Sequence, residues 1–174
     1  MIYGPLYGLI ISFAVALLEA ITISSTGLWG FVMNFLGSAS FVLISSLVYK
    51  YRRTLGGAIA GLSLAVIFST VVMLGLNVLI TPIYMGVAVG QVLALIPTLL
   101  LPFNLMKAVF NAGIVLLLYK PIVRAMRKAK LIEGGEHHAN DKRSSVVVFL
   151  LALIFIIIGV AGFLVLNGKI KFFR

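Results

Sequence analysis

Five long apolar stretches constrain this chain more than any other feature of its sequence. A transmembrane helix needs about 20 consecutive, mostly apolar residues. The stretches that meet this need are Leu6–Ser24, Leu28–Tyr49, Leu55–Ile80, Leu101–Tyr119 and Ser144–Leu166. The chain has 174 residues and is 62% hydrophobic, against about 45–50% in soluble domains, so one soluble core cannot bury its apolar surface. We therefore predict an all-α, polytopic integral membrane helical bundle with about five transmembrane helices.

The polar segments between these stretches suggest three parts. We expect a membrane domain of four spans over residues 1–130, a polar cytoplasmic linker over 131–143, and an additional helix with a basic tail over 144–174. The segment Thr81–Leu100 is apolar but contains Pro82 and Pro97. Because proline interrupts helices, we expect a loop with a short surface helix there, and no further span. The Tyr119-Lys120-Pro121 string is expected to end the fourth span.

Basic residues are concentrated in two of the connections between spans. The chain has 14 Lys and Arg against 4 Asp and Glu, and they gather at Lys50–Arg53 and Lys120–Lys130. Cytoplasmic loops are enriched in such residues, so both connections are expected inside the cell. The uncharged turns then lie outside and the amino terminus lies inside, although the basic tail after Leu166 opposes this orientation. The charge thus predicts a multi-pass protein of the cell membrane, in contact with the lipid bilayer, with no nucleic-acid partner.

The sequence contains none of the common catalytic or metal-binding motifs. It has no cysteine, no G-x-x-x-x-G-K-[ST] phosphate loop, and no H-E-x-x-H or G-x-S-x-G string. The adjacent His137 and His138 lack further ligands for a metal ion. We therefore predict that the protein is not an enzyme, with no catalytic residue, no metal and no cofactor.

Small residues and polar residues inside the spans predict two different roles. Gly57-x-x-x-Gly61, continuing to Ala65, is typical of a face for close helix packing, and Gly4-x-x-x-Gly8 suggests the same. Polar side chains within a span usually face protein or a water-filled cavity. Five of them lie at a similar expected depth, roughly 5–10 Å below the outer surface: Glu19, Asn34, Asn77, Asn104 and Lys107.

These five residues are the predicted substrate-binding residues. Asn104, Lys107 and Asn111 also share one helix face, because they are spaced three and four apart. A cation beside amides favours an outward-facing cavity for a polar aromatic or anionic small molecule. The alternative is structural: asparagines join helices by hydrogen bonds, and Lys107 pairs with Glu19 or reaches the outer interface.

Several strings together resemble a known transporter family. They are Gly4-Pro-Leu-Tyr-Gly8, Gly30-Phe-Val-Met-Asn-Phe35, Asn77-Val-Leu-Ile-Thr-Pro-Ile-Tyr-Met-Gly86, Leu101-Pro-Phe-Asn-Leu-Met-Lys107 and Leu116-Leu-Leu-Tyr-Lys-Pro121. In this order they resemble the riboflavin-type substrate-binding (S) component of energy-coupling factor (ECF) vitamin transporters, over about Gly4 to Lys128. The resemblance implies riboflavin as the transported ligand, contacted by Asn77, Asn104 and Lys107. It also implies a transmembrane coupling subunit and two ATPase subunits as partners.

The chain departs from the family pattern at both ends. Two helices usually precede the Gly4-Pro-Leu-Tyr-Gly8 string, so the usual first two helices are expected to be missing, and the span at Ser144–Leu166 is additional. The resemblance implies an S component of a vitamin importer, most simply for riboflavin captured from the outer face. The residues are also compatible with two alternative functions: an S component for another vitamin, or a structural or assembly membrane protein that binds no ligand.

Overall fold

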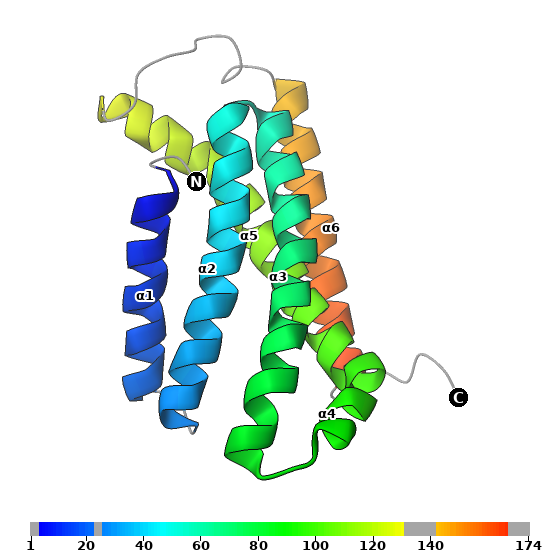
Figure 1. The fold of residues 1–174 in the computed structure, drawn as a ribbon. Helices are drawn as coiled ribbons and strands as arrows, with labels where there is room; N and C mark the ends of the chain where they lie inside the picture. The colour runs from blue at the N-terminus through cyan, green and yellow to red at the C-terminus, as the bar shows by residue number, and fades with distance from the viewer. Residues whose placement is uncertain (1–3, 23–25, 131–141, 167–174) are drawn as a thin grey trace. The chain divides into compact units, whose positions relative to one another are not determined.

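The computed structural model describes residues 4–22, 26–130 and 142–166, and their regular structure is entirely helical (Figure 1). The elements are α1 (Pro5–Thr22), α2 (Gly27–Tyr51), α3 (Leu55–Met85), α4 (Val89–Leu95), the π-helix η1 (Ile96–Leu100), α5 (Leu101–Lys128) and α6 (Lys142–Leu166). Residues 131–141, with His137 and His138, and the basic tail lie outside the described residues. The predicted all-α fold is confirmed.

Four helical segments of the described chain are long and apolar enough to cross a membrane. They are Pro5–Thr22, Gly27–Tyr51, Leu55–Met85 and the continuous segment Val89–Met126. The fifth predicted span corresponds to helix α6. Within α6, the described residues include a shorter apolar helical segment, Ala152–Gly162. The described residues therefore contain four such segments together with α6, in agreement with the predicted polytopic helical bundle.

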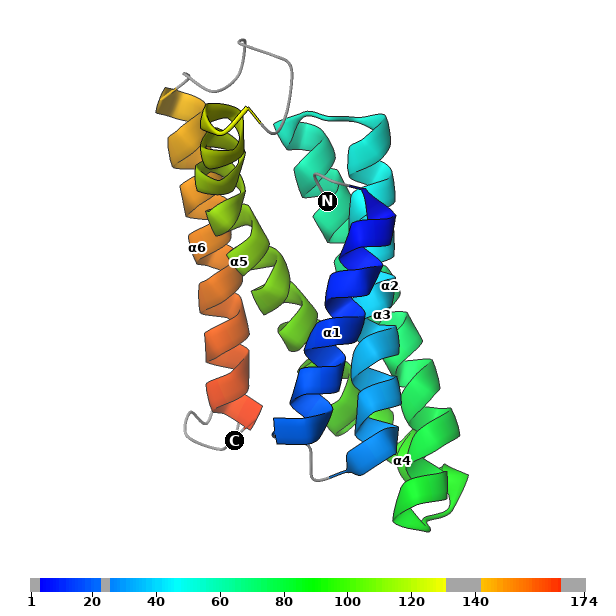
Figure 2. The ribbon, with the colours of Figure 1, turned by 90° about the vertical axis from the view of Figure 1, so that its left-hand side faces the viewer.

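The described chain forms two compact units, residues 1–108 and 109–174. In the first unit, α1 packs against α2 and α2 against α3, with successive helices running in opposite directions (Figures 1 and 2). The end of α1, the beginning of α2 and the end of α3 consequently lie at one end of the unit, where α4 contacts α3. We call this end of residues 1–108 the α4 end. By the distribution of basic residues, it is the end expected to face outward.

Small residues allow α2 and α3 to approach closely. A Cβ atom on Gly61 would lie 3.0 Å from the backbone oxygen of Ser45 in α2, and Ala58 and Ala65 are fully buried. Gly57 instead meets the backbone of Arg52, in the connection between the two helices. The sequence thus identified the packing face correctly, although the first glycine accommodates the turn and not the neighbouring helix.

A second contact of this kind joins α1 to α2, where Gly8 lies against Val42. Gly4, the other glycine of that pattern, has open space around its Cα atom. Close packing therefore involves Gly8 alone of the two residues.

The segment expected to be a loop is largely helical. Helix α3 continues through Pro82 to Met85, and Gly86, with a left-handed backbone conformation (φ 65°), caps it with its N–H donating to the Pro82 carbonyl. After a turn at Gly86–Ala88, α4 continues through η1 directly into α5. The short helix was predicted, but the loop around it was wrong because prolines are tolerated when a helix is supported in a membrane protein.

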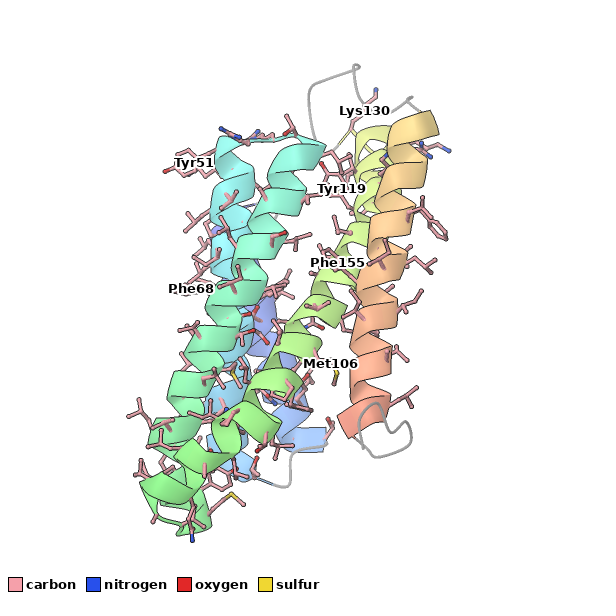
Figure 3. The ribbon with its side chains drawn as sticks, turned by 90° about the vertical axis from the view of Figure 1, so that its right-hand side faces the viewer. Tyr51, Phe68, Met106, Tyr119, Lys130 and Phe155 are labelled. Atoms are coloured by element: carbon pink, nitrogen blue, oxygen red, sulfur yellow. The ribbon has the colours of Figure 1, made fainter. Side chains whose placement is uncertain are left out.

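In the second unit, the continuation of α5 packs against α6 through glycines. Gly113 faces Ala152, Phe155 and Ile156, and Gly159 faces Phe110. Phe155 is labelled on α6 in Figure 3. Helix α5 also continues through Pro121 to Lys128, beyond the expected end of the fourth span. Figure 3 labels Tyr119, within this part of α5, and Lys130, in the turn after the helix ends.

Candidate functional site

The predicted substrate-binding residues all belong to the first unit, residues 1–108. Glu19 lies three residues before the end of α1, Asn34 seven residues after the start of α2, and Asn77 eight residues before the end of α3. At 1.5 Å per residue, Asn77 is about 12 Å from the end of its helix. Asn77 is therefore farther from the end of its helix than the sequence suggested, because α3 extends beyond Ile80.

Asn77 is a buried carboxamide held by its own helix. Only 9% of the residue is exposed, its Nδ2 atom donates to the Met73 carbonyl at 2.7 Å, and its Oδ1 atom accepts from the Thr81 hydroxyl at 3.3 Å. A carboxamide offers two N–H donors and an oxygen with two lone pairs. One N–H and one lone pair of Asn77 therefore remain for another partner.

Asn104 is the second buried carboxamide of the unit, with 5% of the residue exposed. Its Nδ2 atom donates to the Leu100 carbonyl at 2.7 Å. Leu100 is the last residue of η1, in which the Leu101 N–H donates to the carbonyl of Ile96, five residues earlier. Such π-helical turns are rare and occur often at functional sites. The irregular turn thus directly precedes the Pro102-Phe-Asn104-x-x-Lys107 string.

The three other predicted residues are more accessible. Lys107 is exposed, whereas Glu19 and Asn34 are half-buried. In the part of the chain that the structure describes, no hydrogen bond or ion pair joins any two of the five predicted residues. The pairing of Lys107 with Glu19 that the sequence left open is therefore not formed there. Asn111 is exposed and belongs to the second unit.

Sequence reasoning missed Thr81 as a member of the site. It is 7% exposed and contacts Asn77 through its side chain. The available signal was its spacing, since a residue four positions after Asn77 lies on the same helix face. The expected loop over Thr81–Leu100 includes Thr81, whereas the structure places it within α3.

An aromatic cluster joins α1 to α2 within the same unit. The ring of Phe13 meets the rings of Phe31 and Phe35 edge-on, with centroids 5.5 Å apart in both cases, and Phe31 and Phe35 are stacked at 6.2 Å. Asn34 lies between the two aromatic residues of α2 in the sequence. No sequence pattern indicates this cluster separately, because phenylalanine is common in the apolar stretches.

The residues of the site can orient a ligand but offer no evident metal centre. Across residues 4–22, 26–130 and 142–166, no three His, Cys, Asp or Glu side chains gather closely enough to hold a metal ion. The chemistry that is present consists of two buried amides, a threonine hydroxyl and an accessible ammonium group. Such groups suit noncovalent recognition of a polar molecule.

Comparison with known proteins identifies a family. Residues 1–119, which include all five predicted residues, match the family described as ECF transporter, substrate-specific component. The chain is also 27% identical over 132 residues to the riboflavin transporter RibU of Staphylococcus aureus (strain TCH60), covering 72% of this chain and 69% of that protein. No solved structure matches the chain significantly. Since the family match covers well over half of its length, this chain belongs to the substrate-specific components of ECF transporters.

Proposed function

We propose that this chain is the riboflavin-capturing subunit of an ECF-type vitamin importer in the cell membrane. Riboflavin would bind from the outer face, in the α4 end of residues 1–108. A transmembrane coupling subunit and two ATPase subunits would supply the movement across the membrane. No bond of the vitamin changes in this process, so the chain needs no catalytic residue.

The observation that carries the choice of ligand is the similarity to the riboflavin transporter RibU, over 132 residues. The burial of Asn77 and Asn104 adds a chemical reason. A flavin has a flat, largely apolar ring system with carbonyl and N–H groups along one edge. Two buried amides suit that edge, because each can both donate and accept hydrogen bonds. Lys107, one helical turn beyond Asn104, would add a cation near the ring carbonyls.

Glu19 and Asn34 are secondary candidates in this proposal. Both are half-buried in helices that reach the α4 end, and Asn34 is flanked by Phe31 and Phe35. A flat ring gains from offset or edge-on contacts with aromatic side chains. We propose that these residues line the same binding region without setting the choice of vitamin.

Titration of the purified full-length chain with riboflavin tests the proposal. Riboflavin fluorescence should be quenched on binding, and Tm should rise with riboflavin concentration because the ligand stabilises only the folded state. Thiamine, a vitamin without a flavin ring, serves as the control and should leave Tm unchanged. Absence of riboflavin binding at micromolar concentrations would contradict the proposal. A rise in Tm with thiamine alone would retain a vitamin-binding function and reject riboflavin.

A further inference from the structure

The bond between Thr81 and Asn77 differs from the bonds of five other buried serine and threonine hydroxyls in α2 and α3. Ser40, Ser45, Ser46, Ser69 and Thr70 are buried, and each donates to a backbone carbonyl of its own helix. Thr81 is equally buried, yet its hydroxyl donates to the side-chain oxygen of Asn77 at 3.3 Å. This hydroxyl therefore contacts a candidate ligand-binding group.

The position of Thr81 makes this arrangement unusual. Pro82 follows it and has no N–H, so the carbonyl of Val78 loses its usual helical donor. A threonine three residues after Val78 is well placed to donate to that carbonyl. The structure instead directs the hydroxyl to the side-chain oxygen of Asn77, so the carboxamide gains a second hydrogen-bond partner.

The two bonds of Asn77 fix the orientation of its carboxamide. The nitrogen end is held by the Met73 carbonyl at 2.7 Å, and the oxygen end by Thr81. A rotation that exchanged the two ends would place a nitrogen donor against the hydroxyl and an oxygen against a carbonyl. The second contact would be repulsive, so the pair of bonds favours one orientation.

We propose that Thr81 is a positioning residue, which holds Asn77 so that its second N–H is presented to an acceptor of the ligand, such as a flavin ring carbonyl or nitrogen. The inference rests on the proposed function and specifies how the site recognises the vitamin. A group fixed before binding loses less conformational entropy when the ligand arrives. Thr81 thus contributes to affinity without contacting the ligand.

Substitution of Thr81 in the full-length chain tests this inference by riboflavin fluorescence titration. Thr81→Val keeps the shape and removes the hydroxyl, and it should weaken riboflavin binding about fivefold, in the range of one lost hydrogen bond. Thr81→Ser restores the hydroxyl and should restore affinity. Thr70→Val is the matched control, because Thr70 is also buried in α3 but donates to the Val66 carbonyl. It should leave riboflavin affinity unchanged.

A double-mutant cycle separates positioning from direct contact. In an Asn77→Ala background, Thr81→Val should have no further effect on riboflavin affinity, because the group that it positions is gone. If Thr81→Val lowered riboflavin affinity equally in the wild-type and Asn77→Ala backgrounds, the inference would be overturned. Wild-type affinity in Thr81→Val, or failure of Thr81→Ser to restore it, would also overturn the inference, with Tm values confirming that each variant is folded. If Thr81→Val does not fold, Thr81→Ala takes its place in the cycle.

The wild-type titration distinguishes the two proposals. Riboflavin binding by the wild-type chain that Thr81→Val leaves unchanged overturns the positioning role and keeps the proposed function. Absence of riboflavin binding by the wild-type chain overturns both.

Discussion

At the scale of single residues, burial separates the candidates that the sequence treated alike. Asn77 and Asn104 are nine-tenths buried or more, whereas Lys107 is exposed. A buried polar group that is left unpaired costs far more free energy than an exposed one. The two amides should therefore contribute most to affinity for a polar ligand, and Lys107 should contribute mainly through its charge.

Replacement of Asn104 tests this ranking. Asn104→Ala should weaken riboflavin binding about tenfold, because a polar group of the bound ligand would lose its partner in a buried place. Gln91→Ala removes an exposed amide of α4 and serves as the control, with unchanged affinity expected. Fluorescence titration of both variants gives the comparison. Equal affinities for Asn104→Ala and the wild type would remove Asn104 from the site.

At the scale of elements, α3 carries most of the interior of the first unit. It has 31 residues, about 46 Å at 1.5 Å per residue, which exceeds the roughly 30 Å of the hydrocarbon core. Its first half buries Ala58, Gly61 and Ala65 as a packing face, and its second half buries Asn77 and Thr81. One helix thus joins the face that holds α2 to the residues proposed to bind the ligand.

The packing face predicts a large effect of a small substitution. Gly61→Val should lower the free energy of unfolding by about 1–3 kcal/mol, because even a Cβ atom would lie 3.0 Å from the Ser45 backbone oxygen. Gly75→Ala, in the same helix, is the control, since nothing lies within 4 Å of its added Cβ atom. Thermal unfolding in detergent should show a lower Tm for Gly61→Val only. Equal Tm values for the two variants would mean that the contact is not tight.

At the scale of the whole molecule, the arrangement of charge predicts an orientation in the membrane. Lys50, Arg52 and Arg53 are exposed at the α2–α3 connection, while the Gly86–Ala88 turn at the α4 end carries no charge. Because cytoplasmic loops are enriched in Lys and Arg, we predict that the two ends of the first unit lie on opposite sides of the membrane. Ligand capture from outside requires that the α4 end face outward.

Cysteine labelling tests this orientation. The chain contains no cysteine, so any labelling of the protein comes from the introduced residue. Ala88→Cys, at the α4 end, should react with an impermeant maleimide in intact cells. Tyr51→Cys, at the exposed end of α2, keeps every charge and should react only after permeabilisation (Figure 3). The reverse labelling pattern would contradict both the orientation and capture from the outer face.

The membrane environment, the helical class and the packing face at Gly61 could all be predicted from the sequence. These properties depend on local composition and spacing, because about 20 apolar residues cannot remain in water and small residues permit close approach wherever they occur. The polar residues within the spans could also be identified. A polar side chain in lipid costs free energy, so such residues are rare in a span and stand out in the sequence. The role of these residues in binding stays a prediction.

Which of these polar groups are buried, and which hydrogen bonds hold them, could be seen only in the folded structure. Burial depends on neighbouring helices, so Asn77 and Lys107 looked equivalent until their surroundings were known. The continuation of α3 through Pro82 was also hidden, because proline usually ends a helix and only packing against neighbours compensates for the lost hydrogen bond. That continuation keeps Thr81 one helical turn from Asn77, and the bond between them exists for this reason.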